Sequence, residues 1–96
     1  MILKDNDDYG IYIKGTADSV YIRGNIVRDN GFAGLYIEAN AGDIYIWDNQ
    51  ILRNIGYGVD AHTSSYFEVI GNVFGENTES PQAYDEYGAG NWSGNY

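Results

Sequence analysis

The sequence contains no cysteine and only one proline, one histidine and one methionine among its 96 residues. The lack of cysteine excludes disulfide bonds and any metal site with thiolate ligands. Basic residues are also few, because five Lys and Arg stand against 14 Asp and Glu, which gives a net charge of −9. Nucleic acid and anionic lipid require clustered Lys and Arg, so neither is expected as a partner. No apolar run is long enough to cross a bilayer, so membrane insertion is not expected either.

What the sequence does contain is a repeat with a period of about 24 residues, which is clearest over residues 34–58. Gly10, Gly34 and Gly58 each begin a run of alternating residues, GIYI, GLYI and GVDA. Each repeat also holds two asparagines with four residues between them, in NIVRDN, NQILRN and NVFGEN, and the third copy is one residue short. A period in the twenties with alternating strands and turn residues predicts a coil of short stacked strands. Helix is disfavoured, because Ile, Val and Tyr dominate and Gly or Asn interrupts every short run.

Alternation within each predicted strand indicates which side chains point inward, because successive residues of a strand face opposite sides. If residues one repeat apart are neighbours in successive coils, the inward positions form five columns, all of them apolar. The predicted columns are Ile11/Leu35/Val59, Ile13/Ile37/Ala61, Val20/Ile44/Phe67, Ile22/Ile46/Val69 and Leu3/Val27/Ile51/Phe74. The asparagines would then stack at the corners as Asn25/Asn49/Asn72 and Asn6/Asn30/Asn54/Asn77, where their amides can bond to one another and to turn backbone.

This pattern over residues 1–77 resembles the right-handed parallel β-helix repeat family, which includes pectate lyases and other carbohydrate-binding or sugar-cleaving proteins. The resemblance implies an all-β fold of about three to four coils, and we expect the chain to be a piece of a longer helix. The tail, AYD followed by GNWSGNY, is similar to the segment that closes the β-helix of the nitrous oxide reductase accessory protein and of archaeal and bacterial surface proteins. Residues 78–96 are therefore expected to form an irregular, truncated closing segment. An extracellular, cell-surface or periplasmic location is implied.

Function should reside in the outward positions, because the inward columns only hold the coils together. Aromatic rings and a carboxylate recur there on two predicted strands of each coil, as Tyr12, Tyr36 and Glu38 on one and Tyr21, Tyr45 and Trp47 on the other. Such rings suit the apolar faces of sugars, while carboxylates bond to sugar hydroxyls, so a polysaccharide is the expected partner. The alternative interpretation is that exposed Tyr residues only pair with one another across strands.

One cluster suggests catalysis instead. The stretch YGVDAH is similar to the YG-x-D-x-H motif of mannuronan epimerases and related alginate lyases, which are also β-helices. That resemblance assigns Tyr57 and His62 as acid and base on a uronate sugar, and Asp60 as a group that positions and neutralises. Asp60 and His62 lie two apart on a strand and so project from the same face. The family uses a further carboxylate on the next coil, for which Asp85 is the nearest candidate.

Two further interpretations concern metal binding and assembly. Asp5, Asp7 and Asp8 cluster at a turn, and oxygen ligands of this kind suit calcium, although three acidic residues in a turn are usually only solvated. No cofactor other than calcium is indicated, and the likeness to the copper-pathway accessory protein supplies no copper site, because soft copper ligands are missing. As a structural spacer, the chain would associate end to end through its open sheet edges. The sequence thus leaves three functions open: polysaccharide binding, uronate chemistry and a spacer.

Overall fold

The computed structural model describes residues 1–15, 19–39, 43–63, 66–77, 82–86, 88 and 90–95, and these form strands and turns. No helix occurs among them, so the described part of the chain offers no helix that could cross a membrane. Within these ranges, twelve short strands of three to five residues follow one another. This matches the all-β class that the sequence predicts.

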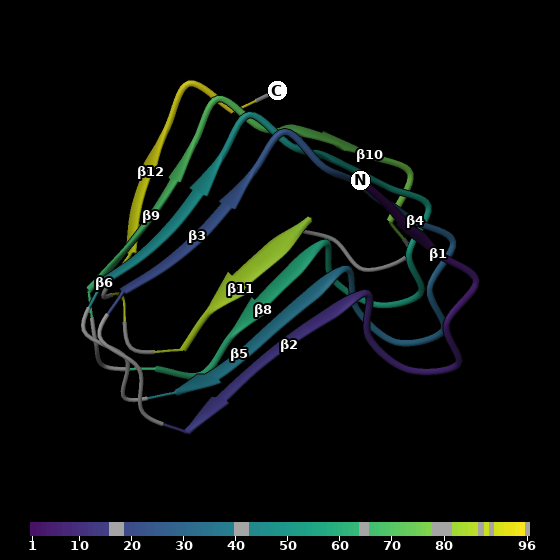
Figure 1. Ribbon diagram of the computed structural model, residues 1–96, viewed down its shortest axis with the longest axis horizontal. Helices are drawn as coiled ribbons and strands as arrows, with labels where there is room; N and C mark the ends of the chain where they lie inside the picture. Colours follow the sequence, from purple (N-terminus) through teal and green to yellow (C-terminus); the bar gives the residue numbers. More distant parts are fainter. Residues whose placement is uncertain are drawn as a thin grey trace.

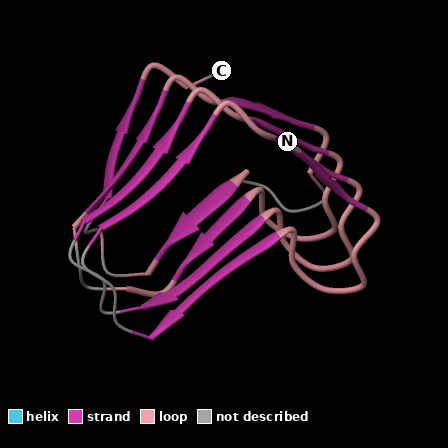
Figure 2. Cartoon of the chain, viewed as in Figure 1, coloured by secondary structure: helices cyan, strands magenta, loops and turns pink. Residues whose placement is uncertain are grey.

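The strands are arranged in three parallel sheets that form the sides of a solenoid (Figures 1 and 2). Sheet 1 consists of β1 (Ile2–Lys4), β4 (Ile26–Arg28), β7 (Gln50–Leu52) and β10 (Val73–Gly75). Sheet 2 consists of β2 (Ile11–Gly15), β5 (Leu35–Ala39), β8 (Val59–Ala61) and β11 (Ala83–Asp85). Sheet 3 consists of β3 (Ser19–Arg23), β6 (Asp43–Trp47), β9 (Phe67–Ile70) and β12 (Gly90–Ser93). Each coil contributes one strand to each sheet, so the molecule is a parallel β-helix.

The register of the sheets confirms that residues one repeat apart are vertical neighbours. Ile13 pairs with Ile37, and Ile37 pairs with Ala61, so each step between coils advances the chain by one full repeat. In sheet 3 the separation falls by one between the second and third coils, where Trp47 pairs with Ile70. The repeat is one residue shorter between β8 and β9, and sheets 2 and 3 keep their register on either side of this segment.

The five predicted inward columns form the hydrophobic core. Ile44, Ile46 and Phe67 are completely buried, as are Leu35, Ile37, Ile51, Val59, Ala61 and Val69. Leu3, Ile11, Val20 and Phe74 belong to the same columns and pack against this core from the outer coils, where they are partly exposed. Burial of apolar surface between coils, not within one coil, therefore stabilises the fold.

Two corners of each coil are built in the same way, by a residue with positive φ followed by an asparagine, and the asparagines of the inner coils are buried. The residues before the asparagines are Gly24, Asp48, Gly71 and Gly94 at one corner and Asp5, Asp29, Arg53 and Glu76 at the other. Each buried asparagine except Asn77 donates its backbone N–H and its side-chain amide to Oδ1 of the equivalent asparagine in the next coil, as Asn49 does to Asn72 at 2.9 and 2.9 Å. Its amide also donates to a backbone carbonyl of the preceding coil, which for Asn49 is Ile22 O at 2.9 Å. The corner asparagines thus satisfy polar groups that the bends would otherwise leave unpaired.

The end of the chain differs from the irregular closing segment expected over 78–96. Residues 78–81, 87, 89 and 96 lie outside the described part, but within the rest β11 pairs with β8 and β12 pairs with β9, both in parallel register. Asn95 accepts from Asn72 at 3.0 and 3.1 Å and so continues one ladder, while Gln82 Oε1 accepts from Asn77 at 3.1 and 2.8 Å and takes the next place in the other. These residues add strands of a fourth coil, which the sequence pattern misses because Asp85 and Gly90 stand in register with the inward apolar residues Ala61 and Phe67.

Candidate functional site

A continuous row of rings runs along the outer face of sheet 2. Tyr12, Tyr36, Asp60 and Tyr84 occupy one register column, one residue from each coil. Tyr9 and Tyr57 flank this column at the turns, and His62 follows β8. We call the six ring-bearing residues Tyr9, Tyr12, Tyr36, Tyr57, His62 and Tyr84 the aromatic strip.

The rings of the aromatic strip contact one another from the first coil to the fourth. Ring centroids lie 4.6 Å apart for Tyr9 and Tyr36 and 5.3 Å apart for Tyr12 and Tyr36. The row continues through His62, whose ring centroid is 5.2 Å from that of Tyr36 and 5.5 Å from that of Tyr84. Tyr57 stacks on Tyr84, with ring centroids 5.5 Å apart. A ligand lying along the solenoid axis would therefore meet rings on every coil.

Two contacts in the strip, Tyr9–Tyr12 and Tyr12–Tyr36, are edge to face, and the other contacts are tilted or stacked. The planes of Tyr12 and Tyr36 are inclined at 83°. Tyr12 and Tyr84 are exposed, and Tyr9, Tyr36 and Tyr57 are half-buried. The Tyr12 hydroxyl donates to Glu38 Oε2 at 3.1 Å, which places a carboxylate at the edge of the strip. Such a surface offers apolar rings together with hydrogen-bonding groups.

The pKa values of Tyr9, Tyr12 and Tyr36 are raised above the usual 10.0 of a tyrosine. Desolvation is the main cause for Tyr9, Tyr12 and Tyr36, and the neighbouring carboxylate of Glu38 adds to the rise in each. The neutral phenol is favoured where a negative charge lies nearby. These hydroxyls therefore remain protonated at neutral pH and can donate hydrogen bonds.

His62 is held between two carboxylates. Its Nε2 lies 2.6 Å from Oδ1 of Asp60 in the same coil, and its Nδ1 lies 2.7 Å from Oε2 of Glu86 in the next coil. Burial acts to lower the pKa of His62, but the hydrogen bond to Glu86 and the charge of Asp60 outweigh burial and raise the pKa above its usual 6.5. The imidazolium is favoured because both ring nitrogens can then donate to an anion.

The predicted catalytic residues Tyr57, Asp60 and His62 lie on one face, but only Asp60 and His62 make contact. The ring of Tyr57 stacks on Tyr84, which also neighbours His62. Asp85, the expected further carboxylate, is engaged elsewhere, because its Oδ2 accepts from the N–H of Gly90 and the indole N–H of Trp92, both at 3.0 Å. Glu86 is the residue that meets His62. Its position one full repeat after His62 is the signal that could have found it.

The second predicted aromatic group lies on the outer face of sheet 3, a different side of the solenoid (Figure 1). Tyr21 and Tyr45 stack with ring centroids 4.9 Å apart and planes inclined at 19°, and Trp47 packs 5.1 Å from Tyr45. Glu68 accepts from the Trp47 indole at 3.2 Å and from the Tyr66 hydroxyl at 2.7 Å. Because Tyr21 and Tyr45 stack, each ring covers one face of the other. One straight ligand cannot lie along both groups.

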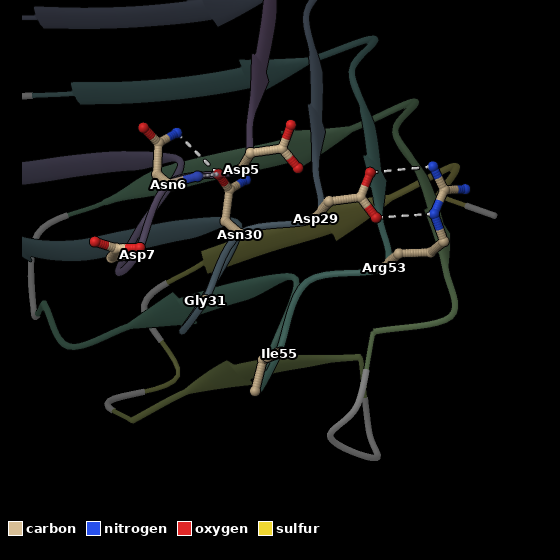
Figure 3. A pocket seen from close by; sticks show the side chains of 8 residues that line it. All are labelled: Asp5, Asn6, Asp7, Asp29, Asn30, Gly31, Arg53 and Ile55. Atoms are coloured by element: carbon tan, nitrogen blue, oxygen red, sulfur yellow. Dashed lines mark hydrogen bonds and ion pairs between the residues drawn. The ribbon is translucent and has the colours of Figure 1, made fainter.

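The acidic turn lies at a shallow hollow between sheets 1 and 2 (Figure 3). Asp5 and Asp7 line this hollow on either side of Asn30, while Asp8 is not among its lining residues. At the edge of the hollow Arg53 makes a two-point ion pair with Asp29, with N–O distances of 3.0 and 3.3 Å. In the part of the chain that the structure describes, no three His, Cys, Asp or Glu side chains are grouped so that they could hold a metal ion. The calcium prediction therefore gains no geometric support.

Comparison with protein families identifies the family of the chain. The family model described as right handed beta helix region matches residues 2–74, which is most of the chain. Searches of the curated proteins and of the solved structures gave no match.

Proposed function

The chain belongs to the right-handed β-helix family, and from this premise we propose that it is a non-catalytic module that binds polysaccharide along the aromatic strip. Binding of a polysaccharide implies a location outside the cell or in the periplasm, and this location forms part of the same proposal. The family membership supports the scaffold, and the proposal itself depends on the outer face of sheet 2.

The observation that carries the proposal is the unbroken row of rings over four coils. Successive strands of a sheet lie about 4.8 Å apart, so the distance from Tyr12 to Tyr84 along the axis is about 14 Å, enough for several sugar rings. Sugars expose apolar C–H faces that pack on aromatic rings, and their hydroxyls can accept from tyrosine O–H groups and donate to carboxylates such as Glu38.

The charges beside the strip favour an uncharged polysaccharide over a uronate polymer. Glu38, Asp60 and Glu86 supply three carboxylates along this face, against which stand Lys14 and the His62 imidazolium. A ligand with a carboxylate on every sugar would be repelled, because like charges brought together at an interface oppose binding. Neutral glycans avoid this cost.

Uronate epimerisation or lysis by Tyr57, Asp60 and His62 is the second candidate, favoured by the close contact between Asp60 and His62. A general base needs a nitrogen lone pair directed at the substrate. Both imidazole nitrogens instead face carboxylates, so catalysis would require the Glu86 contact to open. For this reason we place binding first. Turnover of alginate or pectate by the protein, abolished by His62→Ala, would reverse that order.

Binding is tested by affinity electrophoresis and isothermal titration calorimetry against a neutral glucan, chitin oligosaccharides and alginate. We expect binding to a neutral glycan that weakens roughly tenfold or more in the Tyr12→Ala/Tyr36→Ala double variant, since each ring contributes about 0.5–1.5 kcal/mol. The matched control is Tyr21→Ala/Tyr45→Ala, which removes two tyrosines from sheet 3 and should leave affinity unchanged. Circular dichroism shows whether each variant is folded. No binding to any neutral glycan, or equal losses in both double variants, would refute the proposal.

A further inference from the structure

At the outer face of sheet 2, the His62 imidazole links the third coil to a carboxylate of the fourth. Among the described strands, β11 is the end strand of sheet 2 and pairs with β8 alone. Backbone hydrogen bonds hold its two ends: Gly58 N donates to Gln82 O at 2.6 Å, and Glu86 N donates to Ala61 O at 3.0 Å. The Glu86 side chain then reaches His62 across the coils.

We propose that His62 is a pH-sensitive clamp that holds the carboxyl-terminal end of β11 on the third coil and releases it when the imidazole loses its proton. This inference goes beyond glycan binding and does not depend on it.

The direction of release follows from the burial of the two carboxylates. A neutral imidazole has one N–H donor and one lone pair, so it can donate to only one of its two partners. The Asp60 side chain is only 9% exposed, whereas that of Glu86 is 40% exposed. An unpaired buried carboxylate is more costly than one that can turn into water. The remaining N–H therefore stays on Nε2 toward Asp60, and Nδ1 then repels Glu86.

The other groups around the imidazole do not replace the lost charge. Tyr36 of β5 and Tyr84 of β11 contact the ring with their own rings. Glu38, one coil before His62 in the same outward column, and Asp60 of β8 add negative charge. Asp85, the remaining acid of β11, bonds to Gly90 and Trp92 instead. Loss of the imidazole proton leaves this face with uncompensated negative charge.

The sign of the pH effect is fixed by the direction of the pKa shift. The folded state raises the pKa of His62 above its usual 6.5. The clamp is therefore fully formed below about pH 6.5, and its contribution is lost as the pH rises through the higher folded value. Release is therefore expected as the pH rises above this ordinary value, not as it falls.

The test uses the fact that the chain has a single histidine, so its ring signals need no assignment by mutation. Heteronuclear NMR of the whole chain follows both ring nitrogens of His62, and amide hydrogen exchange follows Glu86 N–H over the same pH series. We expect the titration midpoint of His62 to lie above pH 6.5. The protection factor of the Glu86 amide, corrected for intrinsic exchange, should fall as the pH rises through that midpoint, by up to about tenfold for each pH unit that separates the midpoint from 6.5. The Leu35 amide, which donates to Gly58 O at 2.8 Å between β5 and β8, should keep its protection.

Glu86→Gln is the variant that separates the clamp from a general effect of pH. The substitution removes a charge from an exposed side chain at the sheet edge, so the variant should fold normally. It should lower the titration midpoint of His62 and abolish the pH dependence of hydrogen-exchange protection at the amide of residue 86. The matched control is Glu68→Gln, which removes a bonded carboxylate from sheet 3 and should change neither measurement. A midpoint at or below 6.5, an unchanged midpoint in Glu86→Gln, or pH-independent protection of Glu86 in the unmodified chain would overturn the proposal.

Discussion

Asn54 Oδ1 accepts two hydrogen bonds from Asn30, one from its backbone N–H at 3.1 Å and one from its side-chain amide at 2.8 Å. Asn54 in turn donates to Asn77 at 2.8 and 2.9 Å and to Val27 O at 3.2 Å, and its side chain is fully buried. One side chain thus links three successive coils.

Asn54→Ala should therefore be strongly destabilising. The truncation leaves the buried Asn30 N–H without its acceptor and removes the bonds from the Asn54 amide to Asn77 and Val27. A buried group left unpaired costs about 1–3 kcal/mol and each lost hydrogen bond adds to this, so we expect a loss of roughly 3 kcal/mol or more. Urea unfolding followed by circular dichroism measures it. The comparison is Asn25→Ala, at the partly exposed end of the other ladder, which should cost about 1 kcal/mol. Equal effects would show that the ladder is not cooperative across coils.

Gly34→Ala should disturb the fold more than Gly24→Ala. A Cβ at position 34 would lie 2.6 Å from Gly58 O and 2.8 Å from Ile51 Cγ2, so backbone of the next coil must shift. We expect the upper part of the overpacking range, about 3 kcal/mol. Gly24 has φ of +68° but nothing within 4 Å of the added carbon, so only backbone strain of about 1–2 kcal/mol applies. Thermal and urea unfolding of the two variants should rank them in this order.

Ile37→Ala should leave a cavity in the middle of the core. Ile37 is fully buried between Ile13 and Ala61, so the expected loss of unfolding free energy is about 2–5 kcal/mol. Ile2→Ala, at a side chain that is 56% exposed, should change stability by no more than about 0.5 kcal/mol. A small effect of Ile37→Ala would contradict the assignment of this column to the core.

The Arg53–Asp29 ion pair predicts an acid-dependent stability. The hydrogen bond from Arg53, with a second from Arg28, lowers the pKa of Asp29 below its usual 3.8. Because the folded value is depressed, the stabilisation is fully present above about pH 4 and is lost as the pH falls through the folded pKa. The difference in unfolding free energy between the unmodified chain and Asp29→Asn should therefore be constant near neutrality and shrink in acid.

Asn is a suitable replacement for Asp29, because the residue has φ of 56° and Asn tolerates this conformation. In an Arg53→Gln background, Asp29→Asn should change the unfolding free energy less, because the main partner of Asp29 is already removed. If the difference in unfolding free energy between the unmodified chain and Asp29→Asn did not shrink in acid, the ion-pair explanation would be wrong.

Much of the fold was predictable because one period organises the whole sequence. Alternation within strands and the regular spacing of the repeat were enough to place Ile37 and Phe67 in the core and Asn54 in a ladder. Positive φ at Arg53 and Glu76 was not predictable, because neither residue type favours that conformation; the corner requires it. The solenoid geometry overrides local preference at these positions.

The candidate site was predicted only in part. Sequence alone placed Tyr12, Tyr36 and His62 on one face, because outward positions follow from the same alternation. It did not show that Tyr21 and Tyr45 stack while Tyr12 and Tyr36 meet edge to face, since ring orientation depends on side-chain torsions. It also missed Glu86, because the weak apolar pattern of the tail concealed a further strand.

The matching of each inward residue to its own equivalent one coil away has an evolutionary consequence. If the block of codons for one repeat is duplicated, every side chain of the inserted coil meets above and below it the same types of neighbour that its template met. The corner between β8 and β9 shows that such blocks can also drift in length by a residue without loss of register. A gene for a molecule of this kind can therefore expand or contract by unequal recombination, with each product starting from a core that already fits.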